Sequence, residues 1–130
     1  MEKQHALQQL EQLQKKLYAI HYACSAMNLD ADTVAPKNTS EGRGVALGVL
    51  AGEEQQLMIC PETRALLDEL DRQKDELDLL HRREVEELRR RCDQLTRIPA
   101  EEYIAYSELV NKAGDVWHKA KEKDDFAMFC

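Results

Sequence analysis

Three histidines in this chain follow an acidic residue at a spacing of three, and that spacing carries metal ligands in some helical proteins. The pairs are Glu2/His5, Asp78/His81 and Asp115/His118. Di-iron bundles combine Glu-x-x-His on two helices with two further glutamates, and all of these side chains project inward. Here aspartate replaces glutamate in two pairs, and helical periodicity places Asp115, Glu2 and His5 off the apolar stripes of their helices. We keep a metal-binding helical bundle as an alternative hypothesis.

The other residue types that support catalysis form no known pattern. The sequence contains no H-E-x-x-H zinc signature, no G-x-S-x-G, no P-loop and no G-x-G-x-x-G. The four cysteines are far apart and include no C-x-x-C pair: Cys24, Cys60, Cys92 and Cys130. Free cysteines on apolar helix faces behave as small hydrophobic residues. We therefore predict no catalytic, cofactor-binding or metal-binding residue within these 130 residues.

The composition excludes several classes of partner. The formal net charge is −7, which disfavours binding to nucleic acid or to an anionic membrane surface. No apolar run is long enough to span a membrane, and no apolar h-region follows Met1. Without a signal peptide, the cysteines are expected to stay reduced in the cytoplasm.

Helical spacing of apolar residues dominates the chain and predicts an all-α fold. We expect an antiparallel bundle of about five helices in a single domain, residues 1–130, with a sixth helix cut short. The expected helices are 1–28, 40–59, 62–73, 79–97 and 99–121, with a loop at 29–39 and the start of a further helix at 125–130. Proline favours the first turn of a helix, so Pro61 and Pro99 mark two of the starts.

Apolar stripes predict which helix faces are buried. The first helix carries a continuous stripe at spacings of three and four, formed by Leu10, Leu13, Leu17, Ile20, Cys24 and Met27. Such a stripe packs against other helices of the chain or forms a dimer seam. The fifth helix carries a similar stripe, formed by Tyr103, Tyr106, Val110, Ala113, Trp117 and Ala120. On the fourth helix, the arginines 89–91 are expected to form a solvated, ion-paired surface.

Three glycines on the second helix lie four residues apart, at Gly44, Gly48 and Gly52. Each glycine in a helix interior costs about 1 kcal/mol relative to alanine. Because glycine permits close approach, this face is predicted to pack tightly against another helix. The opposite face offers Val45, Val49 and Leu50.

Several short motifs, in order, resemble one protein family. They are Leu88-Arg-Arg-Arg91, Ile98-Pro-Ala-Glu101, Ser107-Glu-Leu109, Trp117 with Ala120, and Asp125-Phe126 with Phe129. The segment from Leu29 to Lys37 is similar to a Trp-Asp-x-Glu-Thr-x-x-Pro loop, with Leu29 in place of the tryptophan. Together they resemble the N-terminal helical region of the carboxypeptidase Taq family of metallocarboxypeptidases, from about Ile20 to Phe129.

This resemblance implies a function for a longer protein. A full-length member would remove C-terminal residues from peptides with a zinc-type divalent metal held by an H-E-x-x-H motif in its C-terminal portion. These 130 residues would then be an inactive scaffold whose partner is that missing catalytic portion, and a homodimer is possible. The family-like loop residues Asp30, Asp32, Thr33 and Pro36 are the expected functional segment. The alternative is a stand-alone helical module for protein interaction or dimerisation.

Overall fold

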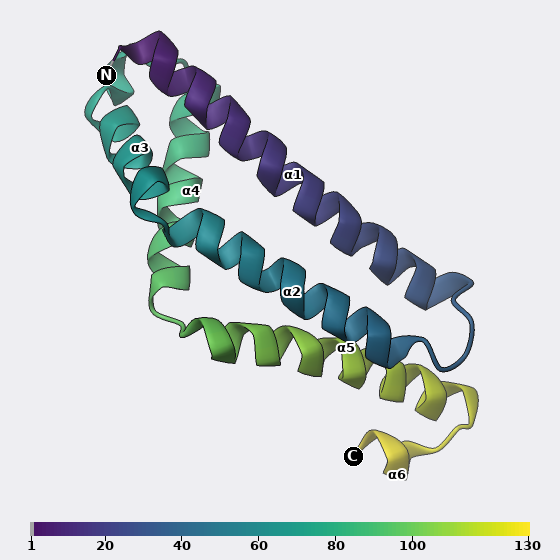
Figure 1. Ribbon diagram of the computed structural model, residues 1–130. Coiled ribbons are helices and arrows are strands. Elements are labelled where there is room, and N and C mark those ends of the chain that lie inside the picture. Colours follow the sequence, from purple (N-terminus) through teal and green to yellow (C-terminus); the bar gives the residue numbers. More distant parts are fainter. Residues whose placement is uncertain (1) are drawn as a thin grey trace.

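The computed structural model describes residues 2–130, which form six α-helices and no strand (Figure 1). The helices are α1 (Lys3–Thr33), α2 (Ser40–Ile59), α3 (Pro61–Arg72), α4 (Leu79–Thr96), α5 (Ala100–Glu122) and α6 (Phe126–Phe129). A short 3₁₀ turn, Lys74–Glu76, connects α3 to α4. The all-α fold predicted from the sequence is confirmed. Within residues 2–130, no helix is both long and apolar enough to cross a membrane.

Helix α2 lies between two long neighbours, because α1 runs antiparallel along one side of it and α5 along the other (Figure 1). Helices α3 and α4 pack at the end of the molecule where α1 begins. The main core is there, and its fully buried members include Leu10, Met58, Leu67, Leu70 and Val85. The first half of the α1 stripe is thus buried within the chain. This agrees with the prediction that the stripe packs against other helices of the same chain.

The end of α1 differs from the prediction. The sequence places a loop at residues 29–39, but the helix continues to Thr33 and only 34–39 are non-helical. The carbonyl of Asp30 accepts bonds from the amides of Val34 and Ala35, at 3.1 and 2.8 Å, which closes the helix end. Pro36 disfavours helical geometry for the residue before it, so it stops the helix here rather than at residue 28. The other helices begin and end within two residues of their predicted bounds.

The glycine face of α2 packs against α5, as predicted. A Cβ at Gly44 would lie 3.0 Å from Asn111 Nδ2, and one at Gly52 would lie 2.9 Å from Ile104 Cδ1. Between them, a Cβ at Gly48 would lie 2.9 Å from Glu108 Oε1. Side chains of α5 therefore fill the space that side chains on α2 would otherwise occupy, which brings the two helix axes close together.

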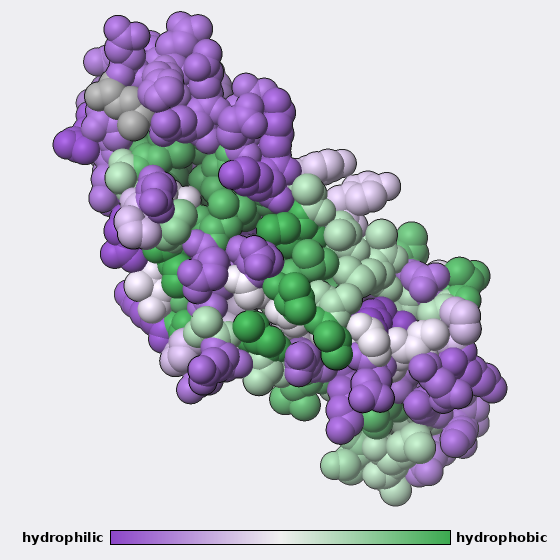
Figure 2. Space-filling model, viewed as in Figure 1, coloured by the Kyte–Doolittle hydropathy of each residue, from purple (hydrophilic) through white to green (hydrophobic). Residues whose placement is uncertain are grey.

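This packing changes which face of α5 is buried. The predicted stripe through Tyr106 and Val110 is wrong there, since these side chains are 63% and 51% exposed. Helix α5 turns Ile104, Glu108 and Asn111 toward the glycines instead. Figure 2 shows hydrophobic surface along α2, between α1 and α5.

Because the glycine face of α2 packs against α5, replacing a glycine by valine should affect stability differently on this face and elsewhere in the chain. We expect Gly52→Val to lower the free energy of unfolding by about 1–3 kcal/mol, because the new side chain overpacks against Ile104. The matched control is Gly114→Val in α5, where an added Cβ has nothing within 4 Å. We expect the control to be neutral or slightly stabilising, since valine has the better helix propensity. Equal effects of the two substitutions on urea unfolding would contradict this packing.

Candidate functional site

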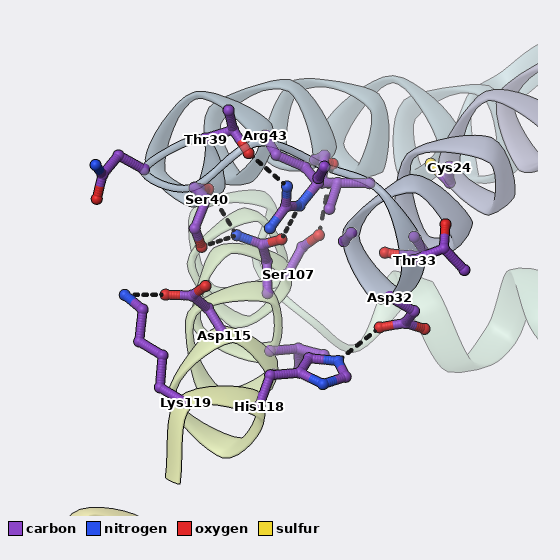
Figure 3. Close-up of a pocket in the computed structure, with 18 of the residues that line it drawn as sticks. Cys24, Asp32, Thr33, Thr39, Ser40, Arg43, Ser107, Asp115, His118 and Lys119 are labelled. Carbon is purple, nitrogen blue, oxygen red and sulfur yellow. Dashed lines mark hydrogen bonds and ion pairs between the residues drawn. The ribbon is translucent and has the colours of Figure 1, made fainter. Parts of the chain in front are cut away.

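A cavity of about 740 Å³ lies between the second half of α1, the 34–39 loop, α2 and α5. Leu47 and Ala51 of α2 line it, together with Tyr106 and Val110 of α5. At its outer end, polar side chains of both charge signs gather, and Figure 3 shows Asp32 and His118 pointing toward one another across it. It is the candidate site, because residues of the family-like loop line it.

The family-like loop residues lie at this cavity. Asp32, Thr33 and Pro36 line it, whereas the backbone carbonyl of Asp30 closes the end of α1. Asp32 Oδ1 lies 2.8 Å from His118 Nε2 of α5. Thr33 uses its hydroxyl to donate to its own helix, at the carbonyl of Leu29, 2.6 Å away. That this loop is the functional segment stays a prediction.

Leu29 departs from the family pattern, and its side chain is 66% exposed. The aromatic ring expected at this position would therefore lie on the surface formed by residues 2–130. In this chain, the position does not contribute to the core.

A polar cluster at the outer end of the cavity fixes the start of α2 to α5. Asn111 Nδ2 donates to the carbonyl of Ser40 over 2.9 Å, and its Oδ1 accepts a bond of 3.1 Å from Arg43 Nε. Arg43 also donates to Thr39 Oγ1 over 3.2 Å (Figure 3). Thr39 precedes α2 without capping it, because its backbone is in the helical region rather than the extended one that an N-cap residue adopts. Its hydroxyl donates to the carbonyl of Pro36. The amide of Asn111 thus binds a part of α2 that has no capping side chain.

At the inner end of the cavity lies a buried carboxylate. Glu54 of α2 is 7% exposed, and its Oε1 lies 2.8 Å from His21 Nε2 of α1. The same oxygen bonds Arg91 of α4. A carboxylate is costly to bury without a charged or hydrogen-bonding partner, so this cluster links the positions of α1, α2 and α4.

Two neighbouring groups respond to this carboxylate. Burial, and then the negative charge of Glu54, raise the pKa of the Cys24 thiol above its ordinary value. The same two causes in the same order raise the pKa of the Tyr103 phenol on α5, although Arg91 opposes them. Both groups line the cavity with Glu54. The inner end is therefore a site where a further negative charge is disfavoured.

The cluster around Glu54 was missed by the sequence reasoning, which placed arginines 89–91 on a solvated surface. Arg91 instead reaches α2, and Arg89 bonds Asp68 and Asp71 of α3. Only Arg90 pairs within its own helix, with Glu87. One signal was available in the sequence: Glu54 lies three residues after Ala51 and four before Met58, on the face that is buried.

The acid–histidine pairs do not converge. Within residues 2–130, no group of three or more histidine, cysteine, aspartate or glutamate side chains is placed to hold a metal ion. Asp78 caps α4 by accepting from the amide of His81 over 2.9 Å. Asp115 pairs with Lys119 at 2.9 Å. The residues present therefore do not fit the metal that the family resemblance implies.

The charge of Glu54 should be measurable at Cys24. In a chain with Cys60→Ser, Cys92→Ala and Cys130→Ser, we expect Glu54→Gln to lower the thiol pKa of Cys24 toward its ordinary value. The shift is partial, because burial is the larger cause and remains. The pH dependence of alkylation by iodoacetamide measures it. Asp68→Asn, which alters an exposed acid paired with Arg89, is the control; an equal shift there would contradict the assignment.

Both the sequence and the fold of this chain match those of known proteins. The model of the family described as carboxypeptidase Taq (M32) metallopeptidase matches residues 9–130. Carboxypeptidase 1 of Bacillus subtilis is 33% identical over 111 residues, which cover 84% of this chain and 22% of that protein. Thermostable carboxypeptidase 1 of Pyrococcus furiosus is 30% identical over 115 residues, covering 88% of this chain and 23% of that one.

A solved structure, described as the BsuCP crystal structure, matches with a TM-score of 0.91 at 30% sequence identity. The match covers 96% of this chain and 25% of that chain. The chain thus spans about a quarter of the length of the relatives it matches. With the family model covering nearly all of its residues, this chain belongs to the carboxypeptidase Taq (M32) family of metallopeptidases.

Proposed function

We propose that this chain is the N-terminal helical part of a metal-dependent carboxypeptidase that removes C-terminal residues from peptides. The observation that carries the proposal is the structural match, which extends over 96% of this chain but only 25% of the solved relative. The sequence contains no H-E-x-x-H, and its histidines and acids are not arranged as a metal site within residues 2–130. The metal and the reacting groups would therefore belong to the remaining three-quarters of such a protein.

The role of these residues in the proposed enzyme is to form a scaffold. The partner of this scaffold is the catalytic portion of the enzyme. The peptide substrate binds only to the whole enzyme, which is located in the cytoplasm. The exposed apolar side chains of α5, including Tyr106, Leu109 and Val110, support this role. Contiguous exposed apolar surface of this kind marks contact with other protein.

A stand-alone interaction module is the alternative, and one surface favours it. The outer face of α1 exposes Tyr18, Tyr22 and Leu29, and the two tyrosine rings lie 6.0 Å apart. The predicted dimer seam through Leu10, Leu13 and Leu17 is not available, because these residues are buried inside the chain. A homodimer or a complex would use the exposed face instead.

The purified chain alone tests the proposal. We expect no release of C-terminal residues from a test peptide and no stoichiometric zinc after purification, since residues 2–130 do not assemble the donor groups for a metal. Full-length carboxypeptidase 1 of Bacillus subtilis serves as the positive control in the same assay. Zinc-dependent release of C-terminal residues by the chain alone would contradict the proposal.

Light scattering distinguishes the stand-alone module from the scaffold. A mass that doubles with concentration in the wild-type chain, and stays monomeric in Tyr22→Asp, would favour the stand-alone module. A monomer at all concentrations would leave the scaffold proposal as the better account.

A further inference from the structure

An apolar stripe runs along α5 beside its contact with α2. It repeats at spacings of three and four residues, and we call it the outer stripe. Its members are Tyr106, Val110, Ala113, Trp117 and Ala120. None of the residues that fill the space at the glycines of α2, namely Ile104, Glu108 and Asn111, belongs to it. Apolar stripes with this spacing pack against a second helix.

The exposure of the outer stripe changes along the helix. At its C-terminal end, Ala120 is 5% exposed and Trp117 is 42% exposed. Ala113 is exposed, and the exposed fraction reaches 63% at Tyr106. The end at Ala120 is therefore covered, whereas the rest of the stripe faces solvent. A contiguous exposed apolar surface of this kind marks contact with other protein.

Helix α6 provides the cover at Ala120. Its two aromatic residues, Phe126 and Phe129, line a hollow of about 370 Å³ together with Trp117 and Ala120 of α5. The rings of Phe126 and Phe129 lie 6.1 Å apart, and both side chains remain exposed. Helix α6 thus packs on the last turns of the outer stripe, but its own apolar side chains are only partly covered.

The turn between α5 and α6 reverses the direction of the chain. The amide of Asp125 donates to the carbonyl of Ala120 over 2.9 Å, and Asp124 has a φ of 50°, a combination that commonly ends helices. Asp125 then caps α6 by accepting a bond of 3.2 Å from the amide of Met128. From this turn, α6 runs back beneath α5 toward the start of that helix (Figure 1). Helix α6 is therefore antiparallel to α5.

The backbone of α6 is still helical at Cys130. The amide of Cys130 donates to the carbonyl of Phe126 over 3.1 Å, which is the bonding pattern of a continuing α-helix. Neither glycine nor proline, which commonly end helices, occurs from Phe126 to Cys130. Phe126 and Phe129 are three residues apart, so they begin the same spacing that the outer stripe carries.

We propose that α6 is the first turn of a longer helix, which packs antiparallel along the outer stripe in the full-length enzyme. The proposal rests on the proposed function, because the rest of this helix belongs to the part of the enzyme outside the matched quarter. Ala120 and Tyr106 are 14 positions apart. Covering the stripe therefore takes about four helical turns, or roughly 21 Å of helix. Apolar side chains at spacings of three and four, continuing from Phe126 and Phe129, face the stripe.

Cysteine alkylation in a joined protein tests this cover. Residues 1–130 are joined to the residues of Bacillus subtilis carboxypeptidase 1 that follow its matched region, and Ala113→Cys is introduced. Ala113 is exposed, lies in the middle of the outer stripe and does not line the cavity of about 740 Å³. We expect N-ethylmaleimide to alkylate this position at least about tenfold more slowly in the joined protein than in the chain alone, because a covered thiol reacts only when its cover opens. Mass spectrometry of the peptide that carries residue 113 gives the rate.

Lys112→Cys is the matched control, since Lys112 is exposed and lies about 100° around the helix from Ala113. We expect its alkylation rate to differ by less than about twofold between the two proteins. Equal rates for Ala113→Cys in the joined protein and in the chain alone would overturn the proposal. If the joined protein does not fold, a cysteine in full-length carboxypeptidase 1 at the position aligned with Ala113 gives a second test. Alkylation of that position as fast as in the denatured enzyme would also overturn the proposal.

The activity of the joined protein tests the proposed function separately. Zinc-dependent release of C-terminal residues without protection at Ala113→Cys would overturn the longer helix but support the proposed function. Protection without activity would support the longer helix and count against the proposed function.

Two further outcomes would identify a different occupant of the outer stripe. Protection of Ala113→Cys in the chain alone, growing with protein concentration, would show that a second copy covers the stripe. Protection that requires an added peptide would show that the peptide covers it. Either result would overturn the proposal.

Discussion

The buried carboxylate of Glu54 sets the arrangement of the helices around it. Among residues 2–130, it is the one acidic side chain that is buried, and it is compensated by Arg91 from α4 and His21 from α1. Removing one partner of such a group leaves a charge without compensation, which is far more costly than the pair itself is stabilising. The register of α1 and α4 along α2 is therefore coupled to this point. The hydrophobic core at the other end of α1 fixes the same helices by burial alone.

A second constraint comes from the glycine face of α2, which determines the contact with α5. Because Ile104, Glu108 and Asn111 enter the space above the glycines, the face of α5 that carries Tyr106 and Val110 is left exposed. This face lines the cavity between α5 and the second half of α1. The exposed apolar surface and the candidate site thus have one physical origin.

Local signals in the sequence predicted the helices well and their long-range partners poorly. Pro61 and Pro99 marked helix starts, and the α1 stripe predicted its buried first half. The middle of the α5 stripe, at Tyr106 and Val110, was predicted wrongly, because periodicity identifies an apolar face but not the shape of the neighbour. The ends of the stripe were predicted correctly, since Ala120 is buried and Tyr103 packs against the core. Arg91 was placed on the surface, since its partner lies 37 residues away in the chain. The resemblance located Asp32, Thr33 and Pro36, which line the cavity, but their role there is untested.

The coupling between Glu54 and Arg91 tests the central claim, that this buried pair ties α4 to α2. A double-mutant cycle with Glu54→Gln, Arg91→Gln and the double variant isolates their interaction from the effects of each substitution alone. Urea unfolding of the four proteins gives the coupling free energy. We expect at least about 1 kcal/mol, because the carboxylate is buried and the arginine is half-buried. A coupling below about 0.3 kcal/mol would contradict it, since the two side chains would then contribute independently.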